Sequence, residues 1–156
     1  MTTFTGAGLK TAGFRGFERF SATDLSRVPE GPGVYVLLRE KGAPPVFLEH
    51  SPAGSHQGRE ATVPLDVLRE AWVARTPLLY VGESKTLRKR ITQLRRQGAG
   101  ESANHGAGIY LWQLSDSGDL RLAWREEEDP AAAKRALLKE FRDAFGCRPF
   151  ANSNDS

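Results

Sequence analysis

Two short runs of sequence decide the fold: GVYVLL at residues 33–38 and LLYVG at residues 78–82. Both are rich in β-branched, leucine and tyrosine residues and are bordered by glycine or proline, so each is predicted to be a β-strand. The second run is followed by TLRKRITQLRRQ at residues 86–97. In that segment the apolar residues recur at the spacing of one helix face, namely Leu87, Ile91 and Leu94. We therefore expect a strand, a tight turn at Gly82 and a basic helix.

The other elements are expected around this strand and helix. Residues 1–20 are glycine-rich and have no clear period, so they are predicted to form an irregular arm or cap, and residues 21–24 a short helical turn. Helices are predicted from Pro64 to Arg75 and from Asp129 to Phe145, where Gly146 ends the second one. Further strands are predicted at 45–50, 109–114 and 120–125, the last two as a hairpin through the turn 116–119.

The composition is that of one small globular domain. The chain has 156 residues, of which 39% are hydrophobic and 26% charged, which suffices for one core and argues against disorder. The order of the predicted elements favours a single α/β domain. Three tryptophans (Trp72, Trp112 and Trp124) are expected in that core rather than on a base-stacking surface.

Several classes of protein are excluded or disfavoured by composition. No apolar run approaches the roughly 20 residues that span a bilayer, and the N-terminus has no apolar segment typical of a secretory signal. The single cysteine, Cys147, cannot form an intramolecular disulfide, so a cytoplasmic location is expected. With one cysteine and three scattered histidines, a closed Cys/His zinc site is not expected.

Positive charge is concentrated in the helix after Gly82. The net charge is only +3, but residues 85–96 contain six cations and no acid. Such a block can neutralise phosphates, or it can be an ordinary solvated helix face. Arg90 borders the apolar stripe, where neighbours can hold its guanidinium as a phosphate ligand. The other cations are candidate nucleic-acid contacts: Lys85, Arg88, Lys89, Arg95 and Arg96.

The last predicted helix carries a candidate metal ligand. Its apolar face consists of Leu137, Leu138, Phe141 and Phe145, and Glu140 lies at the edge of that face. Most glutamates on helices are simply solvated, but a carboxylate at a core edge is also a plausible ligand for Mg²⁺ or Mn²⁺, which favour oxygen donors. Taken alone, Tyr35 and Tyr80 would be read as core aromatics and Asn152 as an ordinary tail residue.

Taken together and in order, these positions resemble the GIY-YIG nuclease domain found in excision-repair incision subunits, homing endonucleases and some restriction enzymes. The resemblance rests on Gly33-Val34-Tyr35, on Tyr80-Val81-Gly82, on Arg90 ten positions after Tyr80, on Glu140, and on Asn152 twelve positions after Glu140. Gly108-Ile109-Tyr110 also spells the family tripeptide, but it follows the Tyr80 motif instead of preceding it, so we assign the role to Tyr35.

The resemblance implies an α/β or α+β fold, with a small mixed or antiparallel sheet flanked by helices and a core of about residues 31–152. It also implies metal-dependent hydrolysis of phosphodiester bonds. Glu140 would hold one Mg²⁺ or Mn²⁺ ion, and Arg90 would stabilise charge developing on the phosphate. Tyr80, helped by Tyr35, would position or deprotonate the attacking water, and Asn152 would orient the site. A phenol has an ordinary pKa of about 10, so it needs nearby positive charge to act as a base near neutral pH. DNA, as duplex or in a structured form, is the expected substrate, and RNA is the weaker alternative.

Two departures from the family pattern support a rival interpretation. Glu83 stands where many members have Lys or a small residue, and Leu94 stands where members often have Tyr or His. His105 is a weak candidate for replacing the missing group. The rival is a nucleic-acid-binding or protein-interaction module that keeps the fold without cutting. The long segment 40–77 lies between the two tyrosine motifs, Gly33-Val34-Tyr35 and Tyr80-Val81-Gly82. It would extend the DNA-contacting surface, dock a targeting partner, or be an ordinary surface loop.

Overall fold

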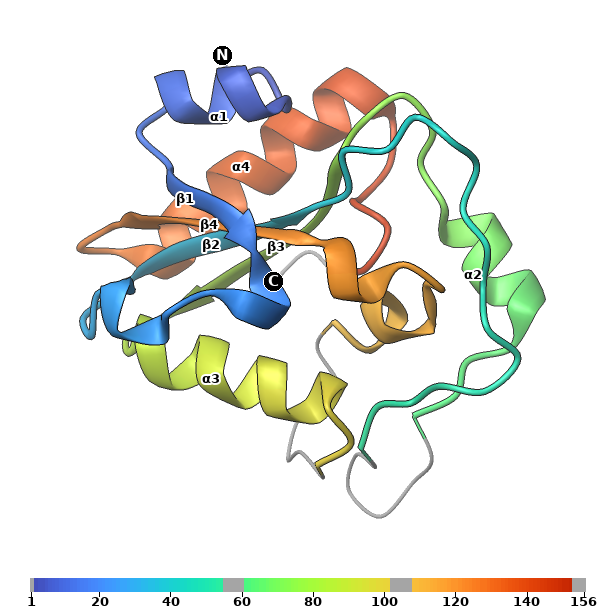
Figure 1. The fold of residues 1–156 in the computed structure, drawn as a ribbon. Coiled ribbons are helices and arrows are strands. Elements are labelled where there is room, and N and C mark those ends of the chain that lie inside the picture. Colours follow the sequence, from blue (N-terminus) through green and yellow to red (C-terminus); the bar gives the residue numbers. More distant parts are fainter. Residues whose placement is uncertain (1, 55–60, 102–107, 153–156) are drawn as a thin grey trace.

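A four-stranded antiparallel sheet forms the centre of the described part of the chain (Figure 1). The structure is a computed structural model that describes residues 2–54, 61–101 and 108–152. The strands are β1 (Arg15–Arg19), β2 (Gly33–Leu38), β3 (Leu78–Ser84) and β4 (Arg121–Glu126), and their spatial order is β1-β4-β2-β3. All six residues of β2 are buried, whereas β3 forms one edge of the sheet.

Helices cover both faces of the sheet (Figure 1). Side chains alternate across a strand, so Tyr35 and Leu37 of β2 face one way and Val34, Val36 and Leu38 the other. The first set packs with Leu87, Ile91 and Leu94 of α3 (Leu87–Gly98). The second set packs with α4 (Pro130–Phe145) and with Leu9 of α1 (Gly6–Thr11). Two hydrophobic cores, one on each side of the sheet, therefore fix where α3 and α4 lie.

The ends of α4 follow the predicted signals. The side chain of Asp129 accepts a hydrogen bond from the backbone N–H of Ala132, and Pro130 occupies the first turn, where no N–H is needed. Gly146 ends the helix with φ at 77°, a left-handed conformation that glycine adopts without strain. Within the described residues no helix is long and apolar enough to cross a membrane.

The expected α+β class is confirmed, and so are the elements that carry the motif. Strands β2 and β3 and helices α3 and α4 lie where the sequence predicted them. Trp112 and Trp124 are buried in the core as expected, and Trp72 is half-buried. Residues 20–22 and 25–27 form two short 3₁₀ turns beside the predicted turn. The helix predicted from Pro64 to Arg75 is shorter, because α2 spans Leu65–Ala71.

The expectation of an irregular arm over residues 1–20 is wrong. The segment contains α1 and the edge strand β1, which pairs with β4. Phe4, Leu9 and Phe14 anchor the segment by burial in the core that also holds α4. The glycines that hid the helix and strand periodicity of this segment have a structural role. Gly13 and Gly16 have positive φ, and the register of β1 shifts after Gly16.

Two predicted strands and their pairing are also wrong. Residues 45–50 make only one isolated bridge, between Phe47 and Leu114, because Pro44 and Pro45 supply no N–H groups for a ladder. Residues 109–113 form a 3₁₀ helix, η3 (Ile109–Gln113), that begins after Gly108 in a left-handed conformation. Tyr110 is thus not a strand residue. Strand β4 pairs with β1 and β2 instead of forming a hairpin with 109–114.

Candidate functional site

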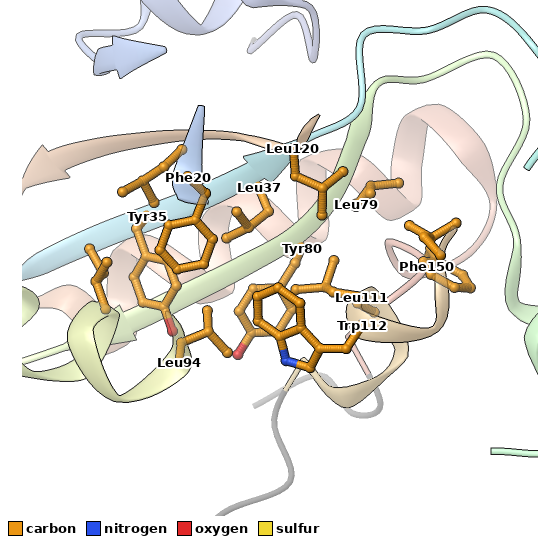
Figure 2. Packing of buried hydrophobic residues seen from close by; sticks show 14 of the residues in the cluster. Phe20, Tyr35, Leu37, Leu79, Tyr80, Leu94, Leu111, Trp112, Leu120 and Phe150 are labelled. Carbon is orange, nitrogen blue, oxygen red and sulfur yellow. The ribbon is translucent and has the colours of Figure 1, made fainter. Parts of the chain in front are cut away.

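Two tyrosines from neighbouring strands pack against each other on the α3 face of the sheet (Figure 2). The ring centroids of Tyr35 on β2 and Tyr80 on β3 are 6.0 Å apart, with the rings inclined by 51°. Tyr35 lies directly opposite Gly82 in the β2–β3 register. A Cβ atom on Gly82 would lie 2.2 Å from Cζ of Tyr35. Gly82, the last residue of Tyr80-Val81-Gly82, therefore makes room for Tyr35, the last residue of Gly33-Val34-Tyr35.

The start of α3 is tied to the chain that leads into β2. No side chain caps this helix at Thr86. Instead, the backbone N–H groups of Leu87 and Arg88 donate to the carbonyl oxygens of Gly31 and Pro29, at 3.0 and 3.1 Å. Gly33 permits the contact, because a Cβ atom there would lie 2.5 Å from Cδ1 of Leu87. The strand that bears Tyr35 and the helix that bears Arg90 are therefore locked together.

Arg90 is the cation that acts on both tyrosines. Burial raises the pKa of Tyr35 well above its ordinary value, the Tyr80 hydroxyl raises it further, and the Arg90 charge opposes both effects. Burial likewise raises the pKa of Tyr80, again opposed by Arg90. The Tyr35 hydroxyl is buried and has no partner in hydrogen-bond geometry among the described residues. Both phenols are therefore protonated at neutral pH.

The cations of α3 separate by helix face into groups with different roles. Residues seven apart lie two turns along the same face, so Arg88 pairs with Arg95, and Lys89 with Arg96. Lys85, Lys89 and Arg96 are exposed. They form the solvent-facing part of the basic block.

Arg88 and Arg95 are engaged with the protein itself. Arg88 donates to the carbonyl oxygens of Val28 and Ser26 and forms an ion pair with Glu30 at 2.8 Å. Arg95 donates to the carbonyl oxygen of Thr23 at 2.8 Å. These bonds fasten α3 to residues 23–30. The two guanidinium groups would have to give up these bonds, at least in part, before contacting a phosphate.

Asn152 closes the free edge of β3. Its side-chain oxygen accepts a hydrogen bond from the backbone N–H of Val81, and its side-chain nitrogen donates to the Val81 carbonyl, both at 2.9 Å. The neighbouring Ala151 N–H donates to the carbonyl of Leu79 at 2.8 Å. Both ends of the amide are thus bound to the strand that carries Tyr80. Asn152 positions Tyr80 through the backbone of β3.

Glu140 lies on α4, which covers the face of the sheet opposite α3. The side chain is half-buried, and no hydrogen bond or ion pair joins it to another described residue. The structure brings Tyr35, Tyr80 and Arg90 together, but no described interaction connects Glu140 to them. The carboxylate whose charge acts on Tyr80 is that of Glu83, which raises its pKa.

Lys134 was missed by the sequence reasoning. It is half-buried on α4, and its pKa is lowered by burial and by the Arg90 charge, against the effect of Glu83. Strand alternation directs Glu83 to the α4 face, two residues after Val81. The signal was present in the sequence, because a cation three residues before Leu137 and seven before Phe141 falls on the apolar face of the helix.

The candidate site suits a metal ion that takes few of its ligands from the protein. Among residues 2–54, 61–101 and 108–152, no three His, Cys, Asp or Glu side chains gather to hold a metal ion. Mg²⁺, however, is commonly held by one or two carboxylates, with waters and substrate phosphates completing its shell. The half-buried carboxylate of Glu140, unpaired among the described residues, fits that pattern. His105 lies outside the described residues.

A cavity of about 740 Å³ beside Gly31 and Pro32 is acidic and does not suit a phosphate. Glu126, Glu127, Glu128 and Asp129 line it, together with the start of α4. Their carboxylates would repel an anion.

Comparisons of the chain with protein-family models, with curated proteins and with solved structures find no match.

Proposed function

We propose that this protein is an endonuclease that uses Mg²⁺ or Mn²⁺ to hydrolyse phosphodiester bonds in DNA through a GIY-YIG-type site. One observation carries the proposal: two tyrosines from adjacent strands pack at 6.0 Å, and the Arg90 charge acts on both hydroxyls. Glycines at positions 33 and 82 make that packing possible. The single free cysteine, Cys147, agrees with a reducing, cytoplasmic location.

In this proposal each residue has a definite task. Arg90 binds the scissile phosphate and stabilises the negative charge that builds up on it. Tyr80, as a neutral phenol, accepts a hydrogen bond from the attacking water and holds it in line. Taking the proton from that water requires a lower pKa, so added positive charge at the phosphate is needed. Glu140 would hold the metal ion, which supplies that charge when bound.

DNA binding is assigned to the outer face of α3. Lys89 and Arg96 are exposed on this helix and Lys85 is exposed just before it, and each can neutralise a phosphate of the substrate. Arg88 and Arg95 support this surface by fastening the helix. Because contacts of lysine and arginine with phosphates carry no sequence information, we expect weak sequence preference or targeting by a protein partner.

A nicking assay on supercoiled plasmid tests this function. Wild-type protein should cut with Mg²⁺ or Mn²⁺ and should not cut with EDTA, while Tyr80→Phe and Arg90→Ala should lose at least about 100-fold in rate. Glu140→Gln should lose activity, whereas Asp143→Asn, a matched change on the exposed side of α4, should keep it. Undiminished cutting by Glu140→Gln would remove Glu140 as the ligand, and Glu83→Gln would then be compared.

A second candidate is a nucleic-acid-binding module that does not cut. Two observations favour it: both tyrosines have raised pKa values, and Glu140 lies on the helix that covers the other face of the sheet. This alternative predicts salt-sensitive DNA binding without metal and an intact plasmid under every condition. Binding that requires no metal, together with complete absence of cutting, would select it over the nuclease.

A further inference from the structure

The helices α3 and α4 begin at the same end of the sheet, although they cover opposite faces of it (Figure 1). α3 starts beside Gly31, whose carbonyl oxygen accepts a hydrogen bond at 3.0 Å from the first backbone N–H of the helix. The next residue, Pro32, lines a cavity together with the start of α4. Gly33 then pairs with Ser84, the last residue of β3. Both helices therefore begin where the edge strand β3 ends.

Each of the two helices carries a half-buried cation near its start. Arg90 is the fourth residue of α3, and Lys134 is the fifth residue of α4. Lys134 shares a helix face with Leu138, which packs in the same core as Val81 of β3. Lys134 lies one turn from that contact toward the start of α4, and Glu83 lies two residues further along β3. Arg90 and Lys134 thus approach the end of β3 from the two faces of the sheet.

The electrostatics agree with this placement. Burial lowers the pKa of Lys134 most, Glu83 opposes that effect, and the Arg90 charge lowers the pKa further. No hydrogen bond or ion pair joins the Lys134 ammonium to another described residue. A half-buried cation that lies close to a second cation destabilises the folded protein. Two cations and one carboxylate leave one positive charge over, which a phosphodiester with its single negative charge would neutralise.

We propose that Lys134 is a second phosphate-binding cation of the candidate site, whose ammonium contacts from the α4 side the phosphate that Arg90 holds from the α3 side. This inference rests on the proposed function and deepens it by assigning a further residue to the same site. The Lys134 Nζ donates to a non-bridging oxygen of the phosphate, and the phosphate removes the repulsion between the two cations. Because residues 126–129 make the neighbouring cavity acidic, the DNA backbone reaches this cluster over the edge of β3.

DNA binding as a function of salt concentration tests the role of Lys134. Fluorescence anisotropy of a labelled duplex oligonucleotide is measured with EDTA present, so that cutting plays no part. Lys134→Met keeps an unbranched side chain and removes its charge, so it should weaken binding about three- to tenfold and reduce the salt-dependence slope by about 1. The melting temperature should stay the same or rise, because an unpaired half-buried cation is lost. Lys134→Arg keeps the charge and should keep the slope.

Lys139→Met is the matched control, because Lys139 is an exposed lysine of the same helix, and it should leave the slope unchanged. An unchanged slope in Lys134→Met would overturn the inference, whether or not the wild type cuts plasmid. An equal reduction in Lys139→Met would overturn it too, since any lysine of α4 would then have the same effect. A reduced slope in Lys134→Met alone, in a protein that never cuts plasmid, would support the phosphate contact and refute only the nuclease.

Discussion

At the scale of single residues, the candidate site depends on the side chain of Tyr35 and on the absence of a side chain at Gly82. Tyr35 lies flat across Gly82, and the absence of a Cβ atom there lets its hydroxyl extend beside Tyr80. The hydroxyl is buried without a hydrogen bond to any residue that the structure describes, an arrangement that costs free energy in the folded state. Such a cost is typical of a position kept for function rather than for stability.

Tyr35→Phe should therefore separate stability from activity. Removing an unsatisfied buried hydroxyl should leave the free energy of unfolding unchanged or raise it by up to about 1 kcal/mol. Plasmid nicking should fall at least tenfold. Urea unfolding followed by circular dichroism, run beside the nicking assay, measures both. A destabilised Tyr35→Phe that still cuts normally would contradict this interpretation.

Gly82→Ala should damage the fold at the same point. The added methyl group would collide with the Tyr35 ring, at 2.2 Å from Cζ, so either the ring or β3 must move. We expect a loss of about 2–4 kcal/mol in unfolding free energy. Gly42→Ala is the control, since nothing lies within 4 Å of a Cβ atom there. Equal stabilities of the two variants would show that the packing of Tyr35 on Gly82 is not tight.

At the scale of elements, α3 combines several tasks by dividing them among its faces. One face packs on the sheet, one fastens residues 23–30 through Arg88 and Arg95, and one exposes Lys89 and Arg96. A basic run in sequence thus becomes two sets of cations with different consequences when removed.

Replacing the exposed pair or the bonded pair of cations by alanine should affect different properties, DNA binding in the first case and thermal stability in the second. Lys89→Ala with Arg96→Ala should weaken DNA binding and lower the salt-dependence slope by about 2, with little change in melting temperature. Arg88→Ala with Arg95→Ala should instead lower the melting temperature by several degrees. Fluorescence anisotropy over a series of salt concentrations and a thermal melt separate the two effects. A double variant of the exposed pair with an unchanged slope would argue against this DNA-binding face.

Asn152→Ala should loosen β3. Val81 would lose both side-chain partners at a buried position, at a cost of about 1–3 kcal/mol. Amide hydrogen exchange should rise along β3 more than along β1, the strand at the opposite edge. Asn152→Asp keeps the acceptor and loses the donor, so it should fall between the wild type and Asn152→Ala. Unchanged exchange in β3 would show that the tail does not hold the strand.

The elements that sequence reasoning found are those with strong local signals. β2, β3, α3 and α4 combine clear periodicity with caps or glycine stops. The segments 45–50 and 109–113 have equally apolar sequences, but their structures are set by prolines without N–H groups and by a left-handed Gly108. In the site, motif order predicted Tyr35, Tyr80 and Arg90. The split of the basic block, the attachment of Asn152 to Val81, and Lys134 all depend on packing between distant segments.

At the scale of the whole molecule, burial of both tyrosines should make stability fall in alkaline solution. The folded chain keeps phenol protons that the unfolded chain releases, because burial raises both pKa values above about 10. The stabilisation is complete below pH 10 and is lost as the pH rises above it. Urea midpoints between pH 8 and 11 measure this loss. Tyr35→Phe should lessen the drop, whereas Tyr110→Phe, outside the pair, should not.

The attachment of Asn152 to β3 also has a consequence for protein synthesis. The strand that bears Tyr80 obtains its outer partner only after residue 152 has left the ribosome. The four α-helices of the described residues are made before that moment, so the outer edge of β3 is completed after them. In the proposed nuclease, Tyr80 would therefore be held in place only when synthesis of the chain is almost complete.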